Sequence, residues 1–298
     1  MGRIAVGEAI GAGFGLIRRE PLTFLAWCAL YFLVSAAPQA IVWPQMMEIY
    51  RTAGSDPAAA LATPSSLGAY QPIAILLGLA LMVVAPAAIF RSVLFPDERR
   101  FFYLRLGMRE LWTTVVSVVV VLAWLVGFLA FLIPILVVTF GAAAVGGAGG
   151  ALFAGIVVFL GYVAAIVGSL WLLIRLSLGP VMSFAENTFR LTESWRLTKG
   201  HAWRIFLVAL GLFAMVVLLE AVLFGGAFAV FASGSPNPAR IFSEPGALPA
   251  LMSRITVPVM LVGYAVFAVF GVWSYVMGAA AWANIYRQLK PELADTFA

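Results

Sequence analysis

The segment SWRLTKGHAWRIF, Ser194–Phe206, gathers the residue types that most often do chemistry: three cations, two tryptophans and the only histidine of the chain. His201 could serve as a general base, but such a base needs an oriented acid and a nucleophile beside it. The nearby Glu193 and Ser194 match no catalytic triad and no metal-ligand spacing. We therefore expect no catalytic residue here and interpret His201 as an interfacial polar residue.

Glu220, in VVLLEAVLF, is the one charged residue well inside a long apolar run. If that run crosses a membrane, a carboxylate there is costly, so it must face protein or a water-filled cavity and is a functional candidate by default. The apolar surroundings also favour its uncharged form. Two interpretations stay open: a glutamate that bridges two helices through a hydrogen bond, or a group that serves transport or ligand binding.

Other common site chemistries find no support in the sequence. Cys28 is the only cysteine, which excludes an intrachain disulfide and a cysteine metal site. The chain contains no Walker loop, no dinucleotide-binding glycine pattern, and neither GxSxG nor HExxH. We therefore expect no metal, no cofactor and no enzymatic activity.

The composition indicates the elements that must position these residues. Hydrophobic residues make up 63% of the 298 residues and charged residues only 10%, too few polar side chains to cover a soluble globule. Apolar runs long enough to cross a hydrocarbon core of roughly 30 Å as helices occupy residues 21–44, 70–90, 112–140, 150–174, 205–231 and 256–286. The uncharged stretch Leu111–Ile174 is too long for one crossing, so the glycine cluster 141–150 predicts a turn. Gly161 and Gly168 predict close packing of the helix that follows.

The lysines and arginines indicate the orientation of these spans. Of the 18, all but Arg51, Arg240 and Arg254 fall in segments on one side, together with both termini. Positive segments stay in the cytoplasm, so both termini are expected there, and a bacterial inner membrane is the natural setting. The formal net charge of +5 reflects this topology. We therefore expect no nucleic-acid partner.

Short amphipathic segments precede the spans. Ser183 and Glu186 have the spacing of a capping box and Gly200 that of a helix stop, which predicts one interfacial helix over residues 183–200. Similar apolar spacings precede the first and third spans, at Val6, Ile10, Phe14 and Ile17 and at Phe101, Leu104, Met108 and Leu111. Aligning these segments puts Leu16, Leu106 and Leu197 in register.

These observations predict an all-α polytopic membrane protein. Its six transmembrane helices form three hairpins, each preceded by a cytoplasmic amphipathic interfacial helix. The chain is expected to be a single integral membrane domain, residues 1–298, with repeats 1–95, 96–180 and 181–298 and threefold pseudo-symmetric packing. The outer loops are expected at 45–69 and 232–255, where Pro, Ser, Ala and Gly are frequent.

The expected binding residues lie at the cytoplasmic ends of the spans. Trp195 and Trp203 match an aromatic belt, and the cations Arg196, Lys199 and Arg204 beside them should attract anionic phospholipid by about 1 kcal/mol each. A dedicated phospholipid site would also need cations from the other units. The internal alignment suggests Arg19 and Arg109 for this role.

The motif S-W-x-L-T-K-G-x-x-W-R-x-F, with the preceding Arg175–Pro180 (RLSLGP), resembles a signature in the membrane domain of bacterial glycerophosphoryl diester phosphodiesterases. It is similar also to related stand-alone six-span inner-membrane proteins of unknown function. The resemblance implies a membrane module of lipid or envelope biology. The catalytic barrel of the phosphodiesterases, about 250 residues, has no counterpart here, so no hydrolase activity is carried over.

The function expected from the sequence is that of a non-enzymatic inner-membrane protein. It would engage anionic lipid at the cytoplasmic face and serve lipid handling, envelope organisation or the binding of a partner, which could be another membrane protein or a second copy. The alternative is a secondary transporter, proton-coupled through Glu220 and using spans kinked at Pro86 and Pro134. An interfacial lipid enzyme that uses His201 is the least favoured alternative.

Overall fold

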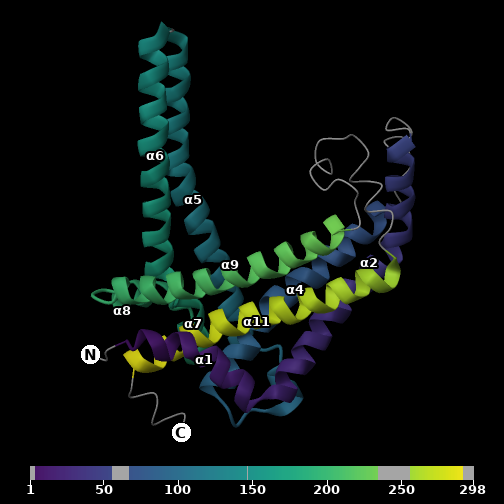
Figure 1. The fold of residues 1–298 in the computed structure, drawn as a ribbon. Helices are drawn as coiled ribbons and strands as arrows, with labels where there is room; N and C mark the ends of the chain where they lie inside the picture. Colours follow the sequence, from purple (N-terminus) through teal and green to yellow (C-terminus); the bar gives the residue numbers. More distant parts are fainter. Residues whose placement is uncertain (1–3, 56–66, 146, 234–255, 291–298) are drawn as a thin grey trace.

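The computed structural model describes residues 4–55, 67–145, 147–233 and 256–290, and within these ranges the chain is helical and contains no strand (Figure 1). The elements in chain order are α1 (Val6–Arg19), α2 (Pro21–Ser55), α4 (Leu67–Leu94), the 3-10 turn η1 (Arg100–Tyr103), α5 (Met108–Val145), α6 (Gly147–Leu176), α7 (Gly179–Glu186), α8 (Leu191–Leu197), α9 (Ala202–Ser233) and α11 (Val257–Leu289).

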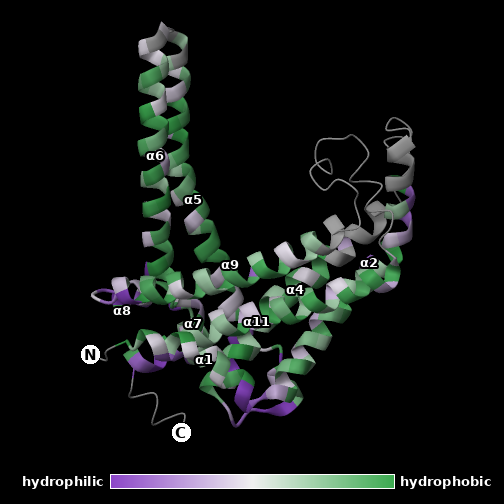
Figure 2. Ribbon diagram, in the orientation of Figure 1, coloured by the Kyte–Doolittle hydropathy of each residue, from purple (hydrophilic) through white to green (hydrophobic). Residues whose placement is uncertain are grey.

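Six of these helices are long and apolar enough to cross a membrane: α2, α4, α5, α6, α9 and α11. They coincide with the six apolar runs of the sequence, which confirms a multi-pass, all-helical membrane protein. Figure 2 shows the hydrophobic residues along α5, α6 and α9, while hydrophilic residues gather at α8 and in the segments at the bottom of the view. Pro86 and Pro134 lie inside α4 and α5, as expected.

The glycine-rich turn between α5 and α6 is confirmed but is shorter than predicted. Residues 141–145 continue α5, and α6 begins at Gly147, whose φ of 77° is in the left-handed region that glycine tolerates. Along the pair, a Cβ atom on Gly168 would lie 2.8 Å from the Phe131 ring, and one on Gly161 would overlap the Ile135 side chain. Both glycines therefore allow α5 and α6 to approach closely, as predicted.

The main core lies between α1 and α11. A Cβ atom on Gly13 of α1 would lie 2.8 Å from the Cα of Met277, so only glycine fits at this crossing. Around it, α11 buries small and aromatic side chains, among them Ala280 and Tyr286. The Ala5 N–H donates a hydrogen bond of 2.7 Å to Gln288 Oε1, which holds the beginning of α1 against the end of α11.

The packing differs from the threefold arrangement expected from the repeats. Helix α11 contacts α1, α2 and α4, whereas α5 and α6 pack mainly on each other and reach the remaining helices through α7, α8 and their own lower ends. Figure 1 shows the α5–α6 pair standing away from the other long helices. The positions aligned in sequence are also not equivalent, because Leu16 is buried in α1 and Leu106 is exposed in a loop. The division into three repeats stays a prediction.

The helix predicted over residues 101–111 is not formed. Phe101, Phe102 and Tyr103 adopt positive φ angles, and regular helix begins only at Met108. The carbonyl oxygens of Phe102 and Tyr103 accept hydrogen bonds from the side chains of Trp27 and Arg91. Side chains distant in the sequence thus satisfy carbonyls that a helix would have paired locally.

The helix predicted over residues 183–200 is two helices, α7 and α8. Asn187 ends α7 in the left-handed conformation, which asparagine tolerates better than most residues. The capping box is therefore wrong: Ser183 lies inside α7, and its Oγ accepts a hydrogen bond of 3.0 Å from the Arg190 N–H just ahead of α8. Gly200 has a φ of 86° in the turn before α9, close to the predicted stop.

The outer loops predicted at 45–69 and 232–255 are partly helical. Residues 45–55 belong to α2, residues 67–69 to α4 and residues 232–233 to α9, while 56–66 and 234–255 lie outside the described residues. These helices therefore extend beyond the apolar runs. A helix that continues out of the hydrocarbon core keeps its internal hydrogen bonds until a helix-breaking residue ends it.

Candidate functional site

The residues expected to bind lipid gather in part at one corner of the fold, between the end of α6 and the start of α9. The Ser194 and Thr198 hydroxyls of α8 donate hydrogen bonds of 3.0 and 3.4 Å to the Arg175 carbonyl at the end of α6. Both hydroxyl-bearing residues are fully buried. The hydroxyls thus cap α6 and fix α8 against it, and the turn at Gly200 leads into α9.

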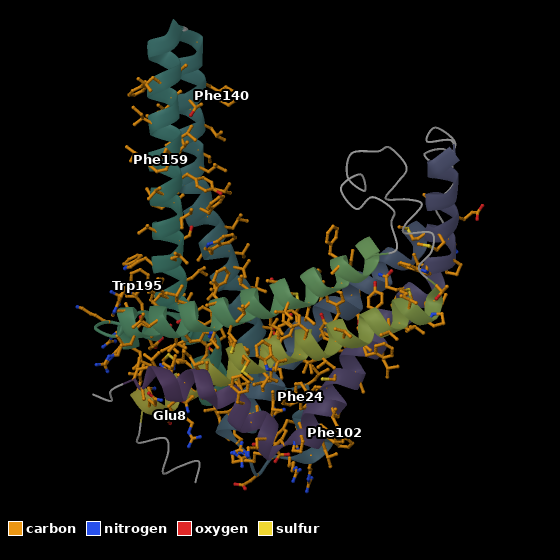
Figure 3. The ribbon with its side chains drawn as sticks, viewed as in Figure 1. Glu8, Phe24, Phe102, Phe140, Phe159 and Trp195 are labelled. Atoms are coloured by element: carbon orange, nitrogen blue, oxygen red, sulfur yellow. The ribbon has the colours of Figure 1, made fainter. Side chains whose placement is uncertain are left out.

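This α8–α9 corner, defined by Trp195, Arg196, Lys199 and Trp203, presents its side chains outward. Arg196 and Lys199 are exposed, and Trp203 is 68% exposed and stacks on Phe206. Trp195 is half-exposed; Figure 3 shows it where α8 meets the base of α6. Two tryptophans and two cations therefore share one accessible surface at the ends of two membrane-spanning helices.

Arg175 belongs to this corner and was missed by sequence reasoning. Its guanidinium lies 5.6 Å from the ring centroids of both Trp171 and Trp195, whose rings meet edge to face at 4.8 Å. Its Nε and Nη1 atoms are buried and find no hydrogen-bond acceptor among the described residues. The i, i+4 spacing from Trp171 was a usable signal, but the contact with Trp195 depends on tertiary packing.

The remaining predicted cations do not converge on the corner. Arg204 donates a hydrogen bond of 3.4 Å to the Ile4 carbonyl, just before α1, while Arg19, at the other end of α1, donates one of 3.0 Å to the Ser92 carbonyl of α4. At 1.5 Å per residue, the two ends of α1 are about 20 Å apart. Arg109 bonds Glu98 at 3.4 Å. The single convergent phospholipid site that includes Arg19 and Arg109 is therefore not formed.

Sequence reasoning also missed a buried ionic cluster where α4 ends and α5 begins. Arg91 and Glu110, only 4% and 2% exposed, form an ion pair. Arg91 also lies 3.1 Å from Glu98 and donates a hydrogen bond of 3.1 Å to the Tyr103 carbonyl. Glu98 in turn pairs with two cations, Arg105 of the same loop and Arg109 at the start of α5. Because buried charges must be paired, this Arg91 cluster fixes the geometry of the loop between the two spans.

A second cluster joins α7 to the end of α11. The Glu186 carboxylate accepts a hydrogen bond of 2.9 Å from the Tyr286 hydroxyl, forms an ion pair with Lys290 and lies 2.8 Å from Arg190. Glu186 and Lys290 are 104 residues apart, so no local pattern could reveal their contact. The cluster links α7, which packs on α5, to α11 of the main core.

The groups around His201 have other partners. Ser194 donates its hydroxyl to the Arg175 carbonyl, and Glu193 accepts a hydrogen bond of 2.8 Å from Arg190. That guanidinium holds the pKa of the Glu193 carboxyl below its ordinary value. Neither residue therefore forms a hydrogen bond with His201. Within the described ranges, no three His, Cys, Asp or Glu residues lie close enough together to hold a metal ion.

Glu220 is half-buried in α9. It makes no hydrogen bond and no ion pair with any other residue that the structure describes. Of its two interpretations, a bridge to another helix is therefore not formed within the described part of the chain. Among the described residues, the Glu220 carboxylate therefore has no partner on the helices around it.

Comparisons with protein-family models, with curated proteins and with solved structures found no match. The resemblance to the membrane domain of the phosphodiesterases therefore stays a prediction.

Proposed function

We propose that this chain is a non-enzymatic protein of the bacterial inner membrane, with both termini in the cytoplasm, that binds anionic phospholipid at its cytoplasmic face. In this proposal the six spans form three hairpins, α1 precedes the first of them on the cytoplasmic side, and α8 lies in the headgroup region. The role would be lipid handling, envelope organisation or the binding of a membrane partner, which includes a second copy of the chain.

One observation carries the proposal: the α8–α9 corner presents Trp203, Trp195, Arg196 and Lys199 together at the ends of α6 and α9. Tryptophan prefers the headgroup depth, where its ring is partly apolar and its N–H finds water or a phosphate. Lysine and arginine at the same depth attract anionic headgroups. The hydroxyls of Ser194 and Thr198 hold α8 in place, so these side chains are positioned before lipid arrives.

The test is native mass spectrometry of the purified protein titrated with phosphatidylglycerol and with phosphatidylcholine. The Arg196→Gln/Lys199→Gln variant should lose affinity for phosphatidylglycerol by at most about 30-fold at low salt, because each cation contributes about 1 kcal/mol. The matched control is Arg18→Gln/Arg287→Gln, which removes two exposed cations that have no partner among the residues that the structure describes. Equal binding of the two lipids by the unsubstituted protein would reject the proposal.

Glu220 supports a second candidate function, a proton-coupled secondary transporter. A carboxylate on a spanning helix without a protein partner can bind a proton or a cationic substrate. Reconstituted protein would be assayed for proton flux driven by candidate solutes. If the unsubstituted protein shows proton flux and Glu220→Gln abolishes it, transport becomes the better supported function. If the unsubstituted protein shows no flux, the transporter function is rejected.

A further inference from the structure

The loop between α4 and α5 holds its backbone in a disfavoured conformation. Phe101, Phe102 and Tyr103 have φ angles of 51°, 54° and 63°. Residues with a Cβ atom avoid this left-handed region because the Cβ approaches the following carbonyl oxygen. Three in succession persist only when the surroundings fix each of them, and such strain is concentrated at functional positions.

Three hydrogen bonds fix this backbone. The Trp27 indole N–H donates a hydrogen bond of 2.9 Å to the Phe102 carbonyl, and Arg91 donates one of 3.1 Å to the Tyr103 carbonyl. The Tyr103 hydroxyl donates one of 3.0 Å to the Pro96 carbonyl, and its ring is fully buried. Tyr103 is therefore the inward anchor of the loop, and the Arg91 cluster holds it there.

The anchored backbone turns the neighbouring apolar side chains outward. Phe101 is 80% exposed and Phe102 is 48% exposed, and Leu106 on the same loop is also exposed. The strained backbone thus holds these three apolar side chains at the surface. Exposed apolar groups of this kind indicate an interaction surface.

Charged side chains surround the two rings. Asp97, Arg99, Arg100, Phe101 and Phe102 line an open hollow of about 400 Å³. Arg99 is held by Glu20 at 2.8 Å. Arg100 has no ion pair and no hydrogen bond with the rest of the described chain, so its guanidinium is available to an anion beside the rings.

We propose that the loop of residues 97–106 docks on the cytoplasmic leaflet of the membrane and seats a phospholipid there. The phosphodiester of the headgroup lies against the Arg100 guanidinium, and Phe101 and Phe102 extend beside the acyl chains. Cations around an apolar tip match the boundary between headgroups and acyl chains. The loop connects two spanning helices through only the 13 residues between Leu94 and Met108, which keeps it close to the membrane surface.

This docking loop is separate from the α8–α9 corner. Figure 3 shows Phe102 and Trp195 at well-separated places on the molecule. The inference rests on the proposed topology, in which α4 and α5 cross the membrane and the loop between them faces the cytoplasm, and it does not depend on lipid binding at the corner. The two surfaces can therefore fail independently.

The first experiment measures the depth of residue 101 while keeping an aromatic ring there. Trifluoromethylphenylalanine replaces Phe101 in the full chain, in nanodiscs of phosphatidylcholine and phosphatidylglycerol, and fluorine NMR records broadening by dissolved oxygen and by a water-soluble gadolinium chelate. The same label at Phe140, exposed along α5, is the reference inside the membrane. If the labelled residue at position 101 prevents folding, the label is placed at position 102 instead.

We expect oxygen to broaden the signal at 101 more than the gadolinium chelate does, as at Phe140. Strong broadening by the chelate in nanodiscs would overturn the proposal. A signal protected only after a cytoplasmic protein fraction is added would also overturn it, because the occupant would then be a protein.

The second experiment tests the headgroup contact. Arg100→Gln should lower phosphatidylglycerol binding by about five-fold in native mass spectra, and this loss should add to that of Arg196→Gln/Lys199→Gln. The control is Arg18→Gln, an exposed cation at the end of α1. An Arg100→Gln effect no larger than that of the control would overturn the headgroup contact even if the rings are inserted.

Discussion

Replacing Arg91 by methionine should destabilise the protein strongly. Methionine keeps an unbranched side chain of similar length but leaves the Glu110 carboxylate, 2% exposed, without the cation that it pairs with. One of its oxygens, Oε2, already has no hydrogen-bond partner within the described residues. The Tyr103 carbonyl loses its donor as well. Removing one member of a buried ion pair costs about 3–5 kcal/mol, and we expect Arg91→Met to fall in this range.

Two further variants separate the charge effect from packing. In Glu110→Gln, Arg91 keeps Glu98 at 3.1 Å, so the loss should be smaller, about 1–2 kcal/mol. The double variant Arg91→Met/Glu110→Leu leaves no unpaired charge from this pair and should be more stable than Arg91→Met alone. The matched control is Arg105→Met, since Arg105 and Glu98 are 40% and 35% exposed in their pair, and this change should cost less than about 1 kcal/mol.

The assay is reversible unfolding in mixed micelles, followed by tryptophan fluorescence, with the free energy of unfolding compared among the four variants. If Arg91→Met costs no more than Arg105→Met, the Arg91 cluster is not a fixed structural element. The same result would weaken the explanation for the left-handed loop, because that explanation needs Arg91 to hold the Tyr103 carbonyl.

Three further predictions concern other contacts. Gly168→Val should weaken the α5–α6 pair by about 1–3 kcal/mol, because its side chain would overlap the Phe131 ring, and a lowered melting temperature in detergent would check this. Ser194→Ala should cost about 1 kcal/mol through the lost hydrogen bond to the Arg175 carbonyl, measured by the same unfolding assay. Cys28, buried in α2, should react with a water-soluble maleimide only after denaturation, and rapid labelling of the folded protein would contradict the packing at this position.

The spans could be predicted from the sequence because a membrane imposes a signal that is averaged over about 20 residues. An error of a few residues at either end of a span does not change the order of the predicted spans. The turn at Gly147 was predictable for a related reason, since an uncharged stretch too long for one crossing must turn, and glycine permits the positive φ. Glu220 was found because one charge in an apolar run is a local signal.

The short elements at the cytoplasmic ends were not predictable from local spacing. The apolar periodicity of residues 101–111 favours a helix, but Trp27 and Arg91 capture the carbonyls that such a helix would use. The predicted helix over 183–200 breaks at Asn187. In the first segment, contacts with these two side chains outweigh the local pattern. In the second, Asn187 adopts the left-handed conformation, and the Ser183 hydroxyl accepts a hydrogen bond from the Arg190 N–H instead of capping a helix.

The ionic clusters could not be predicted from the sequence because their members lie far apart along the chain. Arg91 and Glu110 lie 19 residues apart on two different helices, so no periodicity relates them. From the sequence alone, Arg91 could be used only to assign the cytoplasmic side of the membrane. The signal that a sequence does offer is weak: an arginine at the end of one span and a glutamate at the start of the next could pair if the connecting loop folds back.

Selection of anionic phospholipid by the cytoplasmic face is the basis of the proposed function, and the lipids that stay with the protein measure this selection. The protein would be extracted from bacterial inner membranes into polymer-bounded discs, and the retained lipids compared with those of the bulk membrane. We predict enrichment of phosphatidylglycerol and cardiolipin that Arg196→Gln/Lys199→Gln reduces and Arg18→Gln/Arg287→Gln does not. A lipid composition equal to that of the bulk membrane, in the unsubstituted protein, would contradict the claim.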